Sequence, residues 1–353
     1  MASAAIPIPT CVADVNRDWF AQIMPGVVEA QILEVVHGTA TKIHVELSYA
    51  PGHTPEKIRV WVKSGMEPHS QQDGLEVVYA GETLYYTQFA DRYETRTPYC
   101  YYAGSDSAGH SILVLDDLLE QGATFVDLQK AGAPDFIARA LTSIARYQAA
   151  SWMAPELYAH EWLRSGGSHH AYDLPGWLYE PVRWAQYAQL PRYQKLPPNL
   201  RDPVKLERAH RFVLEDFCRR APWALCHGDC HFGQAYVLPD GEVRLLDWQA
   251  IQIAHWAHDV SYFMAGAFSP QDRRHHERDL LHHYLRALQD FGVAQVPSEE
   301  EAWLAYRICV LHGIGWVMCP PEMQPEDNCA TMAERYATAV FDHDSIGLID
   351  SLR

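Results

Sequence analysis

The sequence lacks the features that mark membrane, secreted and repeat proteins. No uncharged run is long enough to span a bilayer, and the first twenty residues hold no basic stretch followed by an apolar core. We therefore expect neither export nor membrane insertion. The 8 cysteines are sparse in a chain of 353 residues, which argues against a disulfide scaffold and predicts a cytoplasmic protein with reduced thiols. There is no internal repeat and no low-complexity tract.

Positive charge is also scarce. The chain has 28 Lys and Arg against 45 Asp and Glu, a formal net charge of -17. This charge repels phosphate backbones and anionic lipid surfaces, so we expect no nucleic acid and no membrane as partner. Neutral or cationic small molecules suit it better. The balance of charges does not determine the oligomeric state.

The content of apolar residues predicts substantial cores. Hydrophobic residues make up 48% and charged residues 21% of the chain, which argues against global disorder. The length exceeds that of a typical single domain and favours two lobes. We therefore expect a folded protein with more than one hydrophobic core.

The apolar patterns divide the chain into a strand-rich and a helix-rich part. Partial alternation predicts strands at 31–37, 42–49, 57–63 and 111–118, with one helix near 75–90. Beyond them, helical periodicity dominates, and we expect helices at 134–152, 204–220, 257–267, 271–291 and 299–317. The fold class is therefore predicted as α+β, with a small antiparallel sheet followed by a mainly helical part.

The most informative segment is 225–249, LCHGDCHFGQAYVLPDGEVRLLDWQ. Phosphoryl transfer needs a carboxylate to orient or deprotonate the attacking hydroxyl, and oxygen ligands for the metal ions that screen the phosphates. Asp229 suits the first task. Gln234, five residues later, and Asp247 suit the second, because catalytic loops of kinases use the same five-residue step and a later metal-binding Asp.

A hairpin should bring these residues together. AYVL and EVRLL are apolar runs of strand length, joined by the turn residues Pro239, Asp240 and Gly241. An antiparallel pair of strands returns Asp247 towards the loop that carries Asp229. The alternative interpretation is that Asp229 is an ordinary loop carboxylate and that Asp247 caps the end of a strand.

Zinc binding is the alternative for the Cys and His side chains. Cys226, His227, Cys230 and His231 carry preferred zinc ligands, but their spacing matches no known Cys-pair motif. Cys226 also suits the end of a buried strand, WALC. The run HHERDLLHHY places His275, His276, His282 and His283 near Asp279, where an exposed amphipathic helix face is the simpler interpretation.

The loop resembles that of the aminoglycoside phosphotransferase and choline kinase group of small-molecule kinases. Their signature HGDxHxxN, followed by a strand ending in DW or DF, is similar to residues 227–231 and 245–248. Gln234 replaces the Asn, as in the maltokinase-like branch with its HGDxHxGQ loop. The sequence ETLYY from Glu82 resembles the ecdysteroid-kinase-like branch. The resemblance extends over most of the chain.

This resemblance implies a protein kinase-like two-lobe fold, with residues 1–117 as the nucleotide-clamping lobe and residues 118–353 as the lobe with the catalytic loop and acceptor pocket. It implies ATP and Mg²⁺ as cofactors. Asp229 would be the catalytic base, and Gln234 and Asp247 the metal ligands. Lys63 would hold the phosphates, positioned by an ion pair with Glu82.

Further contacts follow from the same resemblance. Gly38 and Thr39 would lie over the phosphates, although a plain hairpin loop is an equally good interpretation, since the single glycine matches no phosphate-binding motif. Main-chain groups of Asp116 and Leu118 would pair with adenine. The structural residues implied around the catalytic loop are His227, His231 and Asp259. The alternative interpretations are that His231 only braces the loop and that Asp259 is an acid in the first turn of a helix. Neither requires a role in the chemistry.

The expected activity is transfer of phosphate to a hydroxyl group of a small molecule. Aromatic residues gather around segment 162–187, where they would either line the acceptor pocket or belong to the core. Aminoglycosides, choline, sugars, hydroxyacyl compounds and bulky hydroxylated lipids all remain candidate acceptors. The alternative function is a nucleotide-binding pseudokinase with a sensing or scaffolding role, because Gln234 and the single-glycine loop depart from the usual pattern.

Overall fold

The structure is a computed structural model that describes residues 6–38, 40–67, 70, 76–163, 173–321 and 323–353. The chain forms two compact units. The first consists of Met1–Asp91 and Arg96–Ala123, and the second of Arg92–Thr95 and Thr124–Arg353. An antiparallel sheet lies in the first unit and most of the helices lie in the second, so the predicted α+β class is confirmed.

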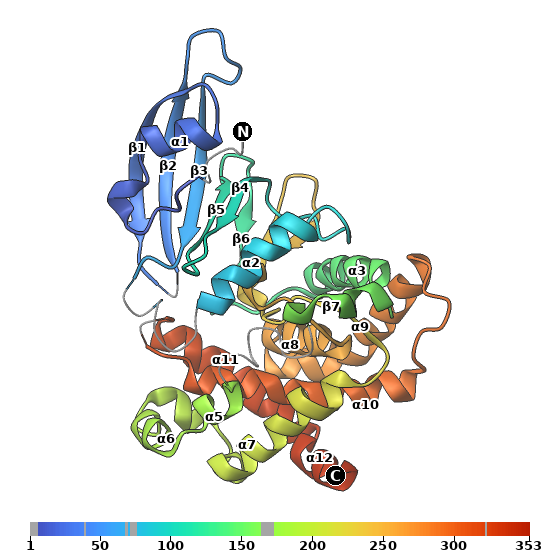
Figure 1. The fold of residues 1–353 in the computed structure, drawn as a ribbon. Helices are drawn as coiled ribbons and strands as arrows, with labels where there is room; N and C mark the ends of the chain where they lie inside the picture. The colour runs from blue at the N-terminus through green and yellow to red at the C-terminus, as the bar shows by residue number, and fades with distance from the viewer. Residues whose placement is uncertain (1–5, 39, 68–69, 71–75, 164–172, 322) are drawn as a thin grey trace. The chain divides into compact units, whose positions relative to one another are not determined.

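The first unit contains a five-stranded antiparallel sheet in the order β1-β2-β3-β5-β4 (Figure 1). Its strands are β1 Val27–Val36, β2 Thr41–Tyr49, β3 Lys57–Ser64, β4 Cys100–Ser105 and β5 Ser111–Asp116. Along β2, Ile43, Val45 and Leu47 are all buried, because alternate side chains of a strand share a face. They pack in one cluster with Trp19 and Phe20 of α1, which spans Arg17–Ile23.

On strand β3, Lys63 and Trp61 lie two residues apart, so their side chains lie on the same face of the sheet. The register pairs Lys63 with Lys42 of β2 and with Leu113 of β5, so these side chains share one face of the sheet. Helix α2, Glu76–Gln88, packs against β4 and β5. This helix occupies the position predicted near 75–90.

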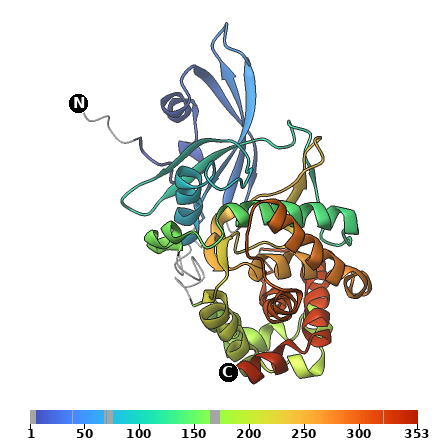
Figure 2. The same cartoon turned by 90° about the vertical axis from the view of Figure 1, so that its right-hand side faces the viewer.

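The second unit is mainly helical. Its α-helices are α3 Pro134–Ala150, α5 Leu174–Leu178, α6 Pro181–Tyr187, α7 Pro203–Arg211, α8 Ala257–Ala267, α9 Pro270–Asp290, α10 Glu299–Cys309, α11 Glu326–Asp342 and α12 Ser345–Leu352. Short 3-10 turns lie at Val12–Asp14 in the first unit and, in the second, at Pro155–Ala159, Glu161–Leu163, Pro191–Lys195, Pro198–Leu200 and Phe217–Arg219. Helices α3 (green) and α9 (orange) lie side by side (Figures 1 and 2). Every residue of α8 is buried, so this helix belongs to the core.

Two small sheets in the second unit carry the segment singled out by its sequence. Strands β7 Trp223–Cys226 and β10 Gln252–His255 pair antiparallel. Strands β6 Thr124–Phe125, β8 Ala235–Val237 and β9 Val243–Leu245 form the other sheet, in the order β6-β8-β9. The hairpin of β8 and β9 is the one predicted from the turn at Pro239 to Gly241.

Two predicted helices are less regular than expected. The helix predicted at 204–220 passes from α7 into a π-helical turn, Phe212–Asp216. The helix predicted at 299–317 changes after Cys309 into the 3-10 segment η11, Val310–Met318. Gly313 lies against Tyr336, and a Cβ there would lie 2.0 Å from the tyrosine ring. Glycine at this position therefore allows the segment to pack closely on α11.

The elements that were not predicted from the sequence include α1, β4, β6, β10, α11 and α12. In the segment 162–187 the structure contains α5 and α6, whereas 164–172 lies outside the described residues. Among the described residues, no helix has both the length and the apolar character needed to cross a lipid bilayer.

Candidate active site

The predicted catalytic loop begins where β7 ends. Strand β7 pairs Cys226 with Gln252 of β10, and the chain then turns at Gly228, which has φ 82°. A Cβ on Gly228 would lie 1.9 Å from the carbonyl oxygen of Ala250. Only glycine allows this close approach of two backbones. The loop of Asp229 therefore packs directly on the segment that follows Asp247.

The hairpin brings the second half of the motif to the same place. The register pairs Ala235 with Leu245, and the N–H of Leu246 donates to the carbonyl of Gln234 at 3.0 Å. Asp247 is the next residue, in the left-handed conformation with φ 68°. The 3-10 turn η10, Trp248–Ala250, follows. Because the strands are paired up to this point, Gln234 and Asp247 lie at neighbouring positions across the hairpin.

Asp229 lies in a strongly perturbed environment. Burial, and next the negative charge of Asp247, raise the pKa of the Asp229 carboxyl to about 7, while hydrogen bonds from Gln234 and Tyr262 act in the opposite direction. Its side chain keeps 29% of its surface exposed, so a reactant can still reach the carboxylate. A carboxyl with a pKa near neutrality is suited to proton transfer.

The donor atoms at this place suit a magnesium ion. Gln234 is 6% exposed, and its Nε2 donates to Oδ2 of Asp229 at 3.5 Å, which leaves the amide oxygen for a cation. No group of three or more His, Cys, Asp and Glu side chains within the described ranges is arranged to hold a metal. Magnesium is commonly bound by one or two carboxylates together with phosphate oxygens and water, so Asp247, Gln234 and a nucleotide would form a sufficient set.

Two histidines stabilise the loop. The Nε2–H of His227 donates to the carbonyl of Leu246 at 2.9 Å, and its Nδ1 accepts the N–H of Asp229 at 3.3 Å. The imidazole therefore connects the loop to the end of β9. His231 accepts the N–H of Gly233 at 3.0 Å. Burial and the nearby His227 lower the pKa of His231 to about 3, against the attraction of Asp247, so His231 is neutral near pH 7.

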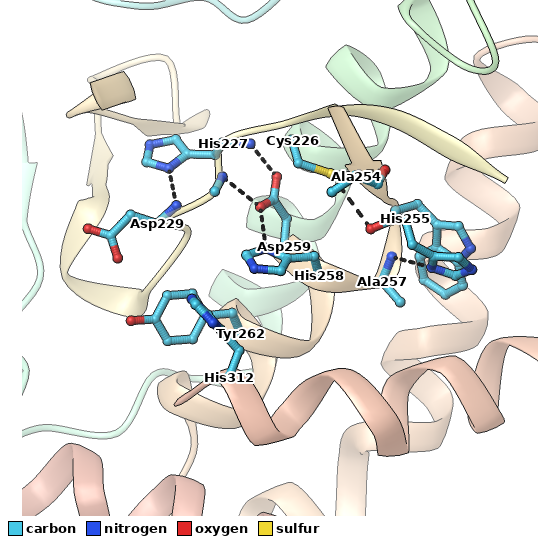
Figure 3. Close-up of polar contacts among 12 residues, drawn as sticks. Cys226, His227, Asp229, Ala254, His255, Ala257, His258, Asp259, Tyr262 and His312 are labelled. Carbon is cyan, nitrogen blue, oxygen red and sulfur yellow. Dashed lines mark hydrogen bonds and ion pairs between the residues drawn. The ribbon is translucent and has the colours of Figure 1, made fainter. Parts of the chain in front are cut away.

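Asp259, in the first turn of α8, holds the loop from below (Figure 3). Its carboxylate accepts the N–H groups of His227 at 2.6 Å and Gly228 at 3.0 Å, and the hydroxyl of Tyr147 at 2.7 Å. Burial acts to raise the pKa of Asp259, but the hydrogen bond and charge of His258, with His227 and Tyr147, outweigh it and lower that pKa. The buried carboxylate thus stabilises the loop in the ionised form.

In the first unit, Lys63 and Glu82 form the predicted ion pair. Nζ of Lys63 lies 2.6 Å from Oε2 of Glu82, and their side chains are 9% and 2% exposed. The pair connects β3 to α2. Burial of both partners distinguishes it from the exposed pairs that contribute little.

The other predicted nucleotide contacts are located as follows. Gly38 lies in the turn between β1 and β2, and Thr39 lies outside the described residues. Asp116 ends β5, and burial raises the pKa of its carboxyl. Leu118 follows in the next turn, where its carbonyl accepts the N–H groups of Gln121 and Ala123.

The aromatic segment shows both kinds of environment. Tyr179 and Trp184 are buried with ring centroids 5.8 Å apart, which favours a core role. Trp177 is partly buried and stacks under the guanidinium of Arg183 at 4.0 Å. In the alternative His cluster, His283 contacts Thr142 of α3 at 2.8 Å, an ordinary contact between helices.

Sequence reasoning missed three residues that contact this site. Tyr147 of α3 donates to Asp259, and Trp316 of η11 donates to the hydroxyl of Tyr262 on α8 at 2.9 Å. Burial and next the charge of Asp229 raise the pKa of Tyr262 well above its usual value. Tyr262 follows Asp259 by three residues and so shares its helix face, a signal that was available. Tyr147 and Trp316 are distant in sequence and had none.

The sequence comparison identifies the family. Residues 38–294 match the sequence profile of the ecdysteroid kinase-like family, and this range includes both Lys63 and Asp247. The chain belongs to the ecdysteroid kinase-like family. No curated protein matches the sequence significantly.

Solved structures share the fold of this ecdysteroid kinase-like protein. An ethanolamine kinase from Plasmodium vivax has a TM-score of 0.52 at 12% identity, over 90% of this chain and 86% of the other. A choline kinase from Cryptosporidium parvum has 0.52 at 10% identity, over 91% and 90%. A spectinomycin phosphotransferase in complex with ADP and spectinomycin has 0.51 at 10% identity, over 90% and 94%. The predicted kinase-like fold is thereby confirmed.

Proposed function

We propose that this ecdysteroid kinase-like protein is an ATP- and Mg²⁺-dependent phosphotransferase that phosphorylates a hydroxyl group of a small molecule. One observation carries the proposal: the β8–β9 hairpin places Gln234 and Asp247 beside the loop of the perturbed carboxyl Asp229. The family and the shared fold with small-molecule kinases support it.

Each residue has a role in the proposed reaction. Asp229 accepts the proton of the acceptor hydroxyl, whose oxygen forms a bond to the γ-phosphorus of ATP while the bond to the bridging oxygen breaks and ADP leaves. Gln234 and Asp247 hold Mg²⁺, which when bound neutralises charge on the phosphate oxygens. Lys63, positioned by Glu82, binds the phosphates as a point charge.

Other residues would serve binding and shape. Gly38 and Thr39 would cover the phosphates, and main-chain groups of Asp116 and Leu118 would bind the adenine. His227, His231 and Asp259 would keep the loop in its reactive shape, in line with their hydrogen bonds. Residues 1–117 would form the nucleotide-clamping lobe and residues 118–353 the catalytic lobe.

Phosphorylation of a library of hydroxyl compounds tests the proposal. Purified protein with ATP and Mg²⁺ should convert at least one compound into a phosphate ester, detected by mass spectrometry. Replacing Asp229 with Asn should lower kcat at least about a hundredfold, the usual range for removal of a general base. Asp290→Asn, an exposed carboxylate at the end of α9, is the matched control and should retain activity.

The same assay separates the alternative function. Thermal stabilisation by ATP with no ester formed from any acceptor would support the nucleotide-binding pseudokinase. Full activity of Asp229→Asn would show that another group accepts the proton.

A further inference from the structure

One face of helix α3 contacts the β8–β9 hairpin. Three polar residues of this helix lie four and three positions apart, a spacing that places them along one side of a helix; they are Arg139, Ser143 and Arg146. The hydroxyl of Ser143 donates to the carbonyl oxygen of Val243 at 2.5 Å. A guanidinium N–H of Arg139 donates to the carbonyl oxygen of Gly241. Side chains of α3 therefore bind two backbone groups of the hairpin.

The third contact between α3 and the hairpin is an ion pair. Nη2 of Arg146 lies 3.2 Å from Oε1 of Glu242, and the two side chains are 18% and 26% exposed. Glu242 lies between Gly241 and Val243 in the sequence. Helix α3 therefore binds three consecutive residues at the place where β9 begins.

These contacts lie at the edge of a small sheet. Within the described residues, β9 pairs with a strand only on the side of β8, in the order β6-β8-β9. The outer edge of such a strand leaves backbone groups without a partner in the sheet, and Ser143 provides a partner for the carbonyl of Val243. Strands β8 and β9 have 3 residues each, and a hairpin this short is not stable alone in water. The position of the hairpin therefore depends on α3.

The same helix also supports the loop of Asp229. Tyr147 follows Ser143 by about one turn of α3, and its hydroxyl donates to Asp259 at 2.7 Å. Asp259 in turn accepts two backbone N–H groups just before Asp229. One helix is thus connected to both halves of the proposed site, the loop of the base and the hairpin that leads to Asp247.

We propose that Arg139, Ser143 and Arg146 are positioning residues for the metal ion, which fix the β8–β9 hairpin so that Gln234 and Asp247 can bind the ion together. This inference rests on the proposed function of these two ligands. One residue of a strand spans about 3.3 Å, whereas metal ligands must lie within about 0.2 Å of their ideal distances. A small displacement of β9 is therefore enough to remove a ligand.

The Mg²⁺ requirement of turnover at saturating ATP tests the inference. Ser143→Ala removes the hydroxyl that binds Val243 and should raise the Mg²⁺ concentration for half-maximal activity about tenfold, with KM for the acceptor changed by less than about twofold. Ser143→Thr keeps the hydroxyl and should behave as the wild type. Thr142→Val is the matched control, because it removes a hydroxyl of the same helix that lies 2.8 Å from His283 of α9. Its Mg²⁺ requirement should remain that of the wild type.

Amide hydrogen exchange provides a readout that needs no turnover. The N–H of Leu246, which donates to the carbonyl of Gln234, should exchange about fivefold faster in Ser143→Ala, as expected for the loss of one hydrogen bond. In Thr142→Val it should exchange at the wild-type rate. An unchanged exchange rate or an unchanged Mg²⁺ requirement in Ser143→Ala would overturn the inference, as would equal changes in Thr142→Val.

A second variant covers the case in which a melting curve shows that Ser143→Ala does not fold. Arg146→Met then decides: a raised Mg²⁺ requirement supports the inference and an unchanged one overturns it. If exchange is faster in Ser143→Ala but the wild type phosphorylates no acceptor, the proposed function fails while the contact between α3 and the hairpin stands. The two failures are therefore distinguishable.

Discussion

At the scale of single residues, the site depends on carboxylates that differ in environment. Burial and the charge of Asp247 raise the pKa of Asp229. The pKa of Asp259 is lowered, because hydrogen bonds and nearby imidazoles outweigh burial. One carboxylate can thus exchange a proton near neutrality and the other remains ionised. Motif spacing predicted Asp229 as the base and the family resemblance predicted Asp259 as a structural residue. Neither could predict the opposite directions of their pKa shifts, since burial depends on the folded chain.

Gln234 is the residue where the motif departs from the usual Asn, and a substitution tests its role. Gln234→Asn keeps the amide oxygen and shortens the side chain by one methylene, so phosphotransferase activity should be preserved or higher. Gln234→Leu removes the oxygen at similar volume and should raise the Mg²⁺ concentration for half-maximal activity about tenfold or more. Both are measured by titrating Mg²⁺ at saturating ATP. An inactive Asn variant would mean that the loop requires the longer side chain.

At the scale of elements, local sequence patterns predicted those strands and turns whose formation depends on neighbouring residues. The turn Pro239 to Gly241 predicted the β8–β9 hairpin, and apolar alternation predicted β2 and β3. Strand β4 and the 3-10 form of η11 were not predicted. Strand β4 forms a local hairpin with β5, the next strand in the sequence, which the sequence analysis did not recognise. The shape of η11 is different, because there Gly313 packs on Tyr336 of the later helix α11. Trp316 was not predicted to belong to the site, because it is also distant in sequence from the residues of the motif.

The contact between the catalytic loop and η10 gives a prediction about this pair of elements. Gly228→Ala would place a Cβ against the backbone oxygen of Ala250, at a positive φ that side chains disfavour. The backbone cannot yield as a side chain would, so we expect a loss of more than about 2 kcal/mol in the free energy of unfolding, with loss of activity. Gly292→Ala has a similar φ and open space, and is the matched control. Urea denaturation measures both. Equal stability of the two variants would contradict the close contact.

At the scale of the whole molecule, the buried Asp259 couples the loop to the stability of the fold. Its folded pKa lies below the unfolded value near 3.8, so its ionised form stabilises the fold above that pH. This contribution disappears as the pH falls through the folded pKa. The hydrogen bonds to charged Asp259 should together contribute about 2–3 kcal/mol at pH 7.

Comparison of Asp259→Asn with the wild type isolates this effect. The wild type should be more stable at pH 7, and the difference should shrink as the pH falls below about 4, because other carboxylates titrate equally in both proteins. The free energy of unfolding from urea denaturation at pH 7 to 3 provides the measurement. A difference that is constant over this range would show that the charge of Asp259 does not stabilise the fold.

Composition and motifs were enough to predict two lobes, a negative net charge and the kinase-like class, because each is a property of the whole sequence. The acceptor did not follow, since its pocket depends on side chains from several separate segments. The family match defines the class of protein, and the roles that we propose for Asp229, Gln234 and Asp247 would define its reaction.

The central claim is that these three side chains meet at a metal-bound triphosphate, and a crystal structure with Mg²⁺ and a non-hydrolysable ATP analogue tests it most directly. We expect a metal ion with oxygen ligands from Asp247 and Gln234 at about 2.1 Å, and the Asp229 carboxylate facing the γ-phosphate outside the metal shell. A nucleotide bound with its metal away from Asp247 and Gln234, or with Asp229 turned from the γ-phosphate, would contradict the account.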